Sequence, residues 1–277
     1  MKFFPVVFIL ISFSQFVKAH NISSFEIPRS SVIDIKDPLS NRVYPIFVKL
    51  PASYERNKQT SYPVIYLTDA LYSFQIVSGA TRFPMNTGKM EEAIIVGISY
   101  SKGSKGPSSR IRDYTHKKDT SWKLETGQAL QHANFIESSI FPYIKSNYRV
   151  NESRTYVGNS LGGLFGAYIL LTKPDMFTNY ILGSPSVWFM NNDILNIKPK
   201  QNLNTHKIFI AVGDRETPEK DSPRHDMVTG AKKLALKLSS EQLPNVKVKF
   251  LAVQGANHET VFPTTAIQGL YWLFKKS

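Results

Sequence analysis

The sequence contains no cysteine, and this absence excludes disulfide bonds, thiolate metal sites and cysteine nucleophiles. It also lacks internal repeats and low-complexity tracts, so solenoid and fibrous architectures are excluded. A chain of 277 residues without disulfides must be stabilised by its core, and its hydrophobic fraction of 42% is sufficient for a large one.

Acidic residues are comparatively few. The chain has 21 Asp and Glu residues and 34 Lys and Arg residues, which gives a net charge of +13. A basic surface attracts anionic substrates or an anionic cell envelope, although an ordinary soluble basic protein has the same composition. The Lys residues are spread along the chain, and no helix-turn-helix, zinc-finger or aromatic RNA-binding signature accompanies them. We therefore expect no nucleic-acid partner.

Long hydrophobic runs are missing except at the amino terminus. There, Lys2 precedes an apolar run at residues 3–16, and the small side chains of Val17 and Ala19 follow. This pattern predicts a secretory signal peptide at residues 1–19 and export to the periplasm or the exterior, with an uncleaved anchor as the alternative. Every later apolar run is shorter than a bilayer requires, so we expect no stable membrane span.

Residues 20–277 predict a single α/β domain. Apolar, β-rich runs predict strands at residues 32–35, 44–50, 63–67, 93–98, 155–157, 180–182, 207–212 and 246–253. Helical periodicity predicts helices at residues 125–148, 161–171, 227–238 and 260–274, the first with a kink or break at Pro142. After a leading hairpin, this alternation predicts a mostly parallel sheet of about eight strands with helices on both faces. Residues 101–123, rich in Ser, Lys, Gly and Arg and without periodicity, predict a long loop.

The pentapeptide Gly158-Asn159-Ser160-Leu161-Gly162 has the form G-x-S-x-G. A strand is predicted directly before it and an apolar helix directly after it, which is the setting of the nucleophile elbow of α/β-hydrolases. We expect a side chain at Gly158 or Gly162 to collide with neighbouring backbone. The sequence thus predicts Ser160 as a nucleophile, with the backbone N–H of Leu161 as an oxyanion donor.

A serine nucleophile requires a base, and His258 is the best candidate. It follows the last predicted strand and precedes the last helix, so its loop returns to the edge of the sheet that carries Ser160. The remaining histidines precede Ser160 or begin an element, and of these His225 is a rival.

The third member of a triad is a carboxylate after the penultimate strand, since the order in α/β-hydrolases is Ser, acid, His. Glu216 is preferred because the turn after Gly213 has room to direct it toward His258. Asp214 is the alternative, and Asp221 or Asp226 are more distant choices. A second oxyanion donor is expected in the loop after the third strand, at the N–H of Ala70 or Leu71.

With these residues in place, the chain resembles the putative-esterase family of α/β-hydrolases, and is most similar to its catecholate-siderophore esterases. The segments that carry the resemblance are residues 62–69, 94–98, 112–115, 156–164, 184–188 and 255–258. The resemblance implies that Arg112 lines the substrate pocket and that Trp188 forms an aromatic wall. The alternatives are a local salt bridge of Arg112 with Asp113 that fixes the long loop, and a core position for Trp188. Two departures from the family pattern are Asn159, where histidine is frequent, and Ala70, where glycine is common.

The sequence therefore predicts a serine carboxylic-ester hydrolase that forms an acyl-enzyme and acts on a small-molecule ester. The resemblance implies an anionic siderophore lactone as substrate. No metal or cofactor is implied. Two alternatives remain open at this point: an acyltransferase with the same triad, and a non-catalytic ligand-binding protein with a hydrolase fold.

Overall fold

The computed structural model describes residues 1, 24–200, 205–221, 223, 225–239 and 245–276. The predicted signal peptide at residues 1–19 lies almost entirely outside the described residues. Within the described part of the chain, no helix is both long enough and apolar enough to cross a bilayer.

One sheet of eight strands runs through the domain in the order β1-β2-β4-β3-β5-β6-β7-β8. The strands are β1 (Ser30–Lys36), β2 (Val43–Lys49), β3 (Tyr62–Leu67), β4 (Ile94–Ile98), β5 (Val150–Asn159), β6 (Asn179–Gly183), β7 (His206–Gly213) and β8 (Val246–Val253). The pairs β1–β2 and β2–β4 are antiparallel, whereas every other neighbouring pair is parallel. The predicted leading hairpin and mostly parallel sheet are confirmed.

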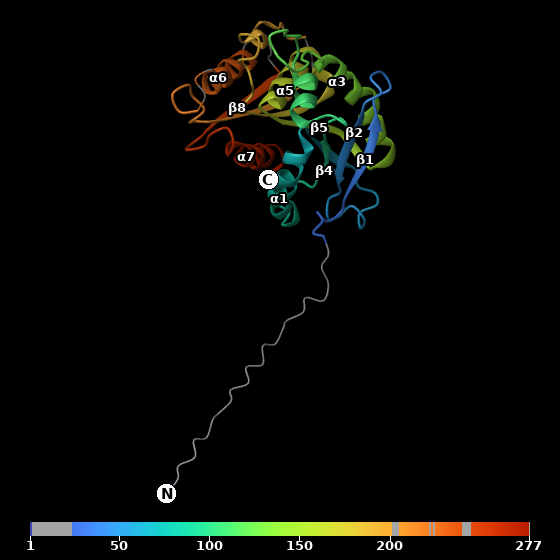
Figure 1. Cartoon of the computed structure of the whole chain (residues 1–277). Helices are drawn as coiled ribbons and strands as arrows, with labels where there is room; N and C mark the ends of the chain where they lie inside the picture. The colour runs from blue at the N-terminus through green and yellow to red at the C-terminus, as the bar shows by residue number, and fades with distance from the viewer. Residues whose placement is uncertain (2–23, 201–204, 222, 224, 240–244, 277) are drawn as a thin grey trace.

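Helices cover both faces of this sheet (Figure 1). The α-helices are α1 (Ala70–Asn86), α2 (Gly106–Tyr114), α3 (Ala129–Phe135), α4 (Phe141–Asn147), α5 (Leu161–Thr172), α6 (Met227–Leu238) and α7 (Val261–Phe274). The shorter turns are the π-helix η1 (Ile136–Ile140) and the 3₁₀ helices η2 (Pro174–Met176) and η3 (Asp193–Asn196). α1 and α7 pack together on one face, where a core around Leu67, Ile181 and Phe209 is buried. The other helices bury a larger core on the opposite face.

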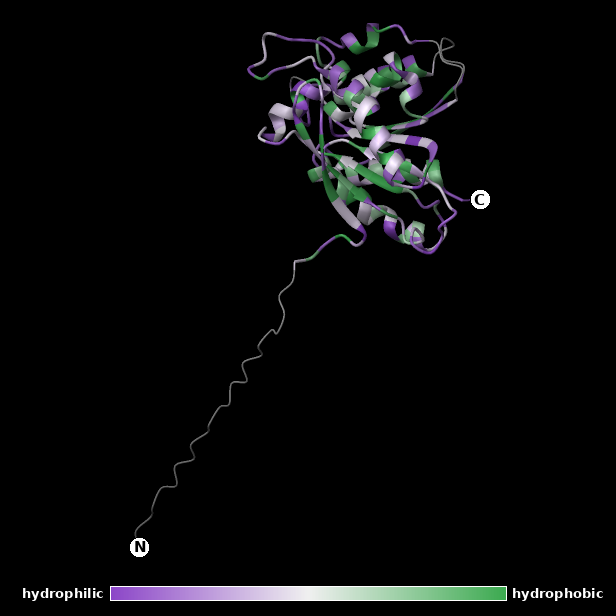
Figure 2. Ribbon diagram, turned by 90° about the vertical axis from the view of Figure 1, so that its right-hand side faces the viewer, coloured by the Kyte–Doolittle hydropathy of each residue, from purple (hydrophilic) through white to green (hydrophobic). Residues whose placement is uncertain are grey.

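The burial pattern explains why the strands of the parallel part of the sheet are continuously apolar. All residues of β3 and β4 are buried, because helices exclude water from both faces. The ribbon in Figure 2 accordingly shows hydrophobic strands inside the molecule and hydrophilic colour on many outer loops and helix faces. The edge strand β1, by contrast, is mostly exposed and covers only part of the core.

One prediction of local structure is wrong in detail, and the expected interruption near Pro142 takes a particular form. Residues 101–123 are not a continuous loop, because Gly106–Tyr114 form helix α2 with Pro107 in its first turn, where its missing N–H costs nothing. The predicted helix at residues 125–148 is divided into α3, η1 and α4. Pro142 lies in the first turn of α4 and cannot donate to the preceding turn, which explains the irregular π turn before it.

Candidate active site

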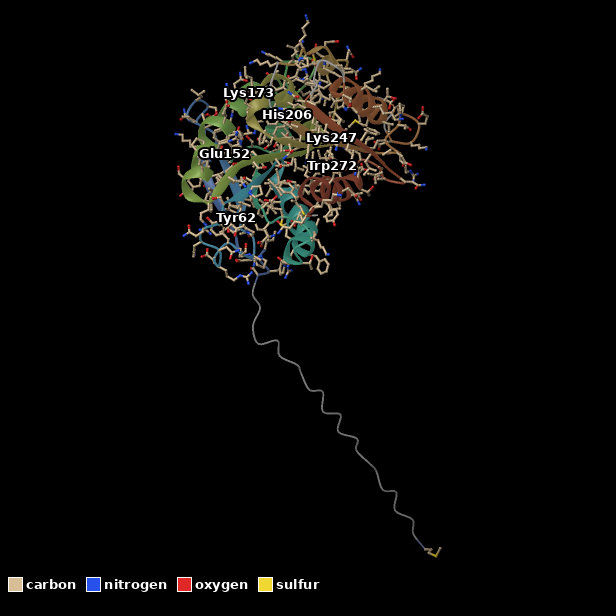
Figure 3. The ribbon with its side chains drawn as sticks, turned by 180° about the vertical axis from the view of Figure 1, so that it is seen from behind. Tyr62, Glu152, Lys173, His206, Lys247 and Trp272 are labelled. Atoms are coloured by element: carbon tan, nitrogen blue, oxygen red, sulfur yellow. The ribbon has the colours of Figure 1, made fainter. Side chains whose placement is uncertain are left out.

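The loops at the carboxyl ends of four neighbouring strands carry the predicted catalytic side chains and their supports. Ser160 follows β5, Ser184 follows β6, Glu216 comes shortly after β7, and His258 comes shortly after β8. Because β5, β6, β7 and β8 are adjacent and parallel, these loops meet at one edge of the sheet. His206, which is labelled in the rear view of Figure 3, begins β7 and therefore lies at the opposite edge of the sheet.

Ser160 has the backbone geometry of a nucleophile elbow. Its φ of 59° and ψ of −119° lie in a region that non-glycine residues avoid, and α5 begins at the next residue. The Ser160 N–H donates to Gly183 O at 2.9 Å, and the Ser186 N–H donates to Ser160 O at 3.1 Å. These two bonds join the elbow to the end of β6 and stabilise the strained turn.

The glycines of the pentapeptide allow this turn to pack closely. A Cβ on Gly158 would lie 2.5 Å from the carbonyl oxygen of Gly162, so the expected backbone collision is confirmed there. At Gly162 the obstacle is different, because an added Cβ would lie 2.5 Å from the side-chain Oγ1 of Thr68. The absence of side chains therefore lets the elbow approach both its own helix and the loop after β3.

His258 and Glu216 are joined by a short hydrogen bond. Nδ1 of His258 lies 2.6 Å from Oε2 of Glu216, although the two residues are far apart in sequence. Since a carboxylate oxygen accepts, the proton of the neutral imidazole lies on Nδ1, and Nε2 has a lone pair. The side chain of Glu216 is completely buried, whereas that of His258 is 32% exposed.

Glu216 is held by two further donors. Its Oε1 accepts from Ser184 Oγ at 2.6 Å and from the backbone N–H of Gly213 at 2.7 Å. A buried carboxylate needs such partners, because an unpaired buried charge is strongly destabilising. Asp214, the alternative acid, instead accepts from the backbone N–H of Gly255 at 2.8 Å on the surface. The structure thus brings Glu216, and not Asp214, to His258.

The pKa of His258 is raised above its ordinary value. Burial alone would lower this pKa, but the hydrogen bond and negative charge of Glu216 outweigh burial, with smaller contributions from Asp221 and Glu259. An imidazole in this setting is a stronger base than free histidine, as proton abstraction from a hydroxyl requires.

Ser160 Oγ lies 3.3 Å from Ser186 Oγ. Within the described part of the chain, no hydrogen bond joins Ser160 to His258, so the hydroxyl has its polar contact with the loop after β6 instead. In sites without substrate, catalytic hydrogen bonds are often long or form only when the substrate binds.

The loop after β3 lies against the elbow and positions the candidate oxyanion donors. Asp69 has a φ of 55° and precedes α1, so the N–H groups of Ala70 and Leu71 are at the helix N-terminus, where no intrahelical acceptor exists. A Cβ on Gly162 would also lie 3.3 Å from Asp69 Oδ2. The N–H of Leu161 is likewise in the first turn of its helix, α5.

Arg110 links this loop to the elbow, and the sequence analysis did not identify it. Its Nε and Nη2 donate to the two oxygens of Asp69 at 3.0 and 3.3 Å, and Nη2 reaches Asn159 O at 3.5 Å. The desolvation of Arg110 is opposed by the charge of Asp69, and the net effect raises the pKa of the guanidinium further. The only feature of the sequence that could have pointed to Arg110 is its position as a basic residue two places before Arg112.

Arg112, which the resemblance placed in the substrate pocket, is buried elsewhere. Its Nε donates to Asp113 at 2.7 Å, and its Nη2 contacts Asp113, Ser101, Ser109 and Tyr44. None of these contacts involves a catalytic candidate among the described residues. Arg112 therefore fixes helix α2 against β2 and the loop after β4, and Arg110 is the arginine that α2 directs to the site.

Trp188 is half-buried in the loop after β6, close to Ser186 in sequence. Its ring is stacked with the ring of His225 at a centroid distance of 3.8 Å and with that of Trp122 at 6.2 Å. The three rings come from three separate segments of the chain. They form an aromatic stack, and its member Trp188 lies two residues after Ser186, which is bonded to the elbow. His225 is part of this stack, and it is His258 whose Nδ1 faces Glu216.

No cluster of three or more His, Asp or Glu side chains suited to a metal ion is found among the described residues. The polar groups at the strand ends are a hydroxyl, an imidazole hydrogen-bonded to a buried carboxylate, and backbone N–H groups in the first turns of two helices.

Comparison with known proteins identifies the family. The profile of the family described as "Putative esterase" matches residues 39–272. The chain belongs to this family. It is also similar to the ferri-bacillibactin esterase BesA of Bacillus subtilis (strain 168), with 32% identity over 268 residues, which cover 90% of each protein. The chain is therefore a hydrolase.

Two solved structures share the fold. The BES protein from Bacillus cereus matches with a TM-score of 0.76 and 28% identity, covering 93% of this chain and 98% of that one. The siderophore hydrolase EstB from Aspergillus nidulans matches with a TM-score of 0.78, covering 92% and 97% of the two chains. At 20% identity, the second likeness concerns the fold alone.

Proposed function

We propose that the protein hydrolyses carboxylic esters through a Ser160 acyl-enzyme, with His258 as base and Glu216 as the acid that orients it. The observation that carries the proposal is the 2.6 Å bond between His258 and the fully buried Glu216, at the sheet edge where the strained Ser160 elbow lies. A buried carboxylate beside an imidazole at this position is the arrangement that activates a serine hydroxyl.

The reaction follows from the positions of these groups. Rotation of Ser160 Oγ away from Ser186 and toward His258 Nε2 lets the imidazole accept the hydroxyl proton while the oxygen attacks the ester carbonyl. The N–H groups of Leu161 and of Ala70 or Leu71 stabilise the oxyanion. His258 then protonates the departing alcohol, and water attacks the acyl-enzyme by the same route to release the acid and regenerate Ser160.

The proposed substrate is a lactone of a catecholate siderophore. BesA, which is named a ferri-bacillibactin esterase, supports this substrate because it resembles the chain over most of both lengths. The rings of Trp122, Trp188 and His225 are only partly buried and can contact an aryl group. The net charge of +13 favours an anionic ferric complex.

A comparison of substrates tests the proposal. We expect kcat/KM for ferri-bacillibactin to exceed that for p-nitrophenyl acetate by about 10²-fold or more, because binding energy from the remote aryl groups is used at the reacting carbonyl. Trp188→Ala should lower kcat/KM for the siderophore and leave acetate turnover nearly unchanged. Equal turnover of both esters, or transfer of the acyl group to an added alcohol in preference to water, would contradict the assignment.

Arg110 is proposed to position the oxyanion loop through Asp69. We expect Arg110→Gln to lower kcat on the order of 10²-fold, because small displacements of catalytic donors have effects of this size. Arg110→Lys should recover part of the rate, since one charged donor still reaches Asp69. Steady-state kinetics with thermal denaturation as a control checks this. A loss of melting temperature with an unchanged kcat in the folded fraction would show a purely structural role.

A further inference from the structure

A cavity of about 500 Å³ lies between α1, the end of β2 and residues 25–29. It is separate from the candidate active site, because it is lined by the later turns of α1. At about 1.5 Å of rise per residue, Arg82 lies roughly 18 Å along the helix from Ala70. The volume is within the range of small-molecule sites.

The two sides of this cavity differ in chemistry. Phe25, Ile27 and Pro28 supply an apolar wall. Arg29, Lys49 and Arg82 supply cations, and no carboxylate is among the described residues that line the cavity. Arg29 and Arg82 are exposed to solvent, whereas Lys49 is buried, and their positive charges act against the charge of Lys49.

Lys49 shows this imbalance most clearly. The residue is only 7% exposed, yet the single hydrogen bond described for its ammonium is a long one, 3.4 Å to Ser78 O. Burial, followed by the charges of Arg29 and Arg82, lowers the pKa of Lys49 to about 8. Buried lysines are normally paired with a carboxylate. Here the described residues provide none, and the donors of Lys49 lack a strong acceptor.

We propose that this cavity binds a small organic anion with an apolar body, such as a carboxylate on a hydrocarbon chain. The anionic group lies between Lys49, Arg29 and Arg82, and supplies the acceptors that the protein lacks. The apolar body packs against Phe25, Ile27 and Pro28. An inorganic anion would pair with the cations but make no contact with the apolar wall. A neutral apolar molecule would leave the cations unpaired.

Gly79 offers a way to block the cavity without changing its charge. It lines the cavity in the middle of α1, and an added Cβ there has no neighbour within 4 Å. Gly79→Phe should therefore be accommodated by the helix and place its ring in the cavity. Gly79→Ala is the matched control, because it adds only a methyl group and improves helix propensity.

Isothermal titration calorimetry of the full chain with sodium octanoate tests the proposal. We expect octanoate to bind wild type and Gly79→Ala equally, and Gly79→Phe and Arg82→Gln at least about tenfold more weakly. Acetate and octanol should each bind wild type at least about tenfold more weakly than octanoate. Acetate has the anionic group without the apolar body, and octanol has the apolar body without the anionic group. Turnover of p-nitrophenyl acetate should be similar in the three variants and wild type, which verifies that they are folded.

Three results would overturn the proposal. The first is the absence of octanoate binding. The second is undiminished binding to both Gly79→Phe and Arg82→Gln, which would place the ligand elsewhere, including the active site. The third is octanol binding as tightly as octanoate. Because esterase activity is measured separately, failure here is distinguishable from failure of the proposed catalytic function.

Discussion

Ser160→Ala is expected to lower kcat by about 10⁴-fold to 10⁶-fold while the protein remains folded, because it removes the hydroxyl that attacks the ester carbonyl. The substitution removes one oxygen whose described contact is a 3.3 Å approach to Ser186. The backbone bonds of Ser160 to Gly183 and Ser186 do not depend on the side chain, so the turn should persist. Initial rates with a p-nitrophenyl ester, together with a melting curve, measure both effects.

The neighbouring hydroxyl provides the control for this result. Ser186→Ala removes the contact to Ser160 Oγ but leaves the elbow, His258 and Glu216 in place, so we expect a change of less than about tenfold. If Ser186→Ala were as damaging as Ser160→Ala, or if Ser160→Ala retained wild-type rates, the nucleophile would be assigned incorrectly. Mass spectrometry of an acyl-enzyme trapped from a slow ester should locate the acyl group on the peptide that contains Ser160.

Glu216→Gln is expected to reduce kcat by about 10³-fold or more, and the reason lies in the donors around the carboxylate. Ser184 and the Gly213 N–H both donate to Oε1, so the amide oxygen of glutamine must take that position. The amide NH₂ then faces His258 Nδ1 and donates to it. The imidazole proton is forced onto Nε2, and the base loses the lone pair that Ser160 requires.

The pH dependence should change in a defined direction in the same variant. Glu216 raises the pKa of His258, and the neutral imidazole is the active base, so wild-type activity should fall as the pH decreases through that raised pKa. Removal of the negative charge lowers the pKa of His258, and the acidic limb of the kcat/KM profile should move to lower pH. Asp214→Asn alters a surface contact to Gly255, so it should leave both the acidic limb of the kcat/KM profile and the value of kcat nearly unchanged. An unshifted limb in Glu216→Gln would mean that another group sets the profile.

The local features of the fold could be predicted from the sequence with good accuracy. Continuous apolar runs identify the buried strands β3 and β4, and amphipathic spacing identifies α6 within its observed bounds. The interruption near Pro142 could be predicted, but its form as the π turn η1 could not. A proline in a helical pattern predicts a break, but whether the chain ends the helix there or inserts a π turn depends on packing against the core.

In the candidate site, too, some features follow from the local sequence and others depend on the packing of distant segments. The Ser160 elbow is encoded locally, since strand, small residues and helix are contiguous in the sequence. The pairing of Glu216 with His258 followed from strand order, but the preference over Asp214 depends on the donors Ser184 and Gly213, which only the assembled loops bring together. Arg110 and Arg112 lie two positions apart on one helix, and nothing in the sequence shows that Arg110 is the one that reaches Asp69.

The sequence by itself determined the alternation of strands and helices, the elbow and the order of the catalytic candidates, because these depend on hydrophobic periodicity and short-range backbone sterics. The tertiary structure decided which carboxylate faces the imidazole, which arginine supports the oxyanion loop, and that three cations surround a cavity without an acid. These are contacts between residues far apart in the chain. Their energies depend on burial and on distance in space, which no local pattern of residues specifies.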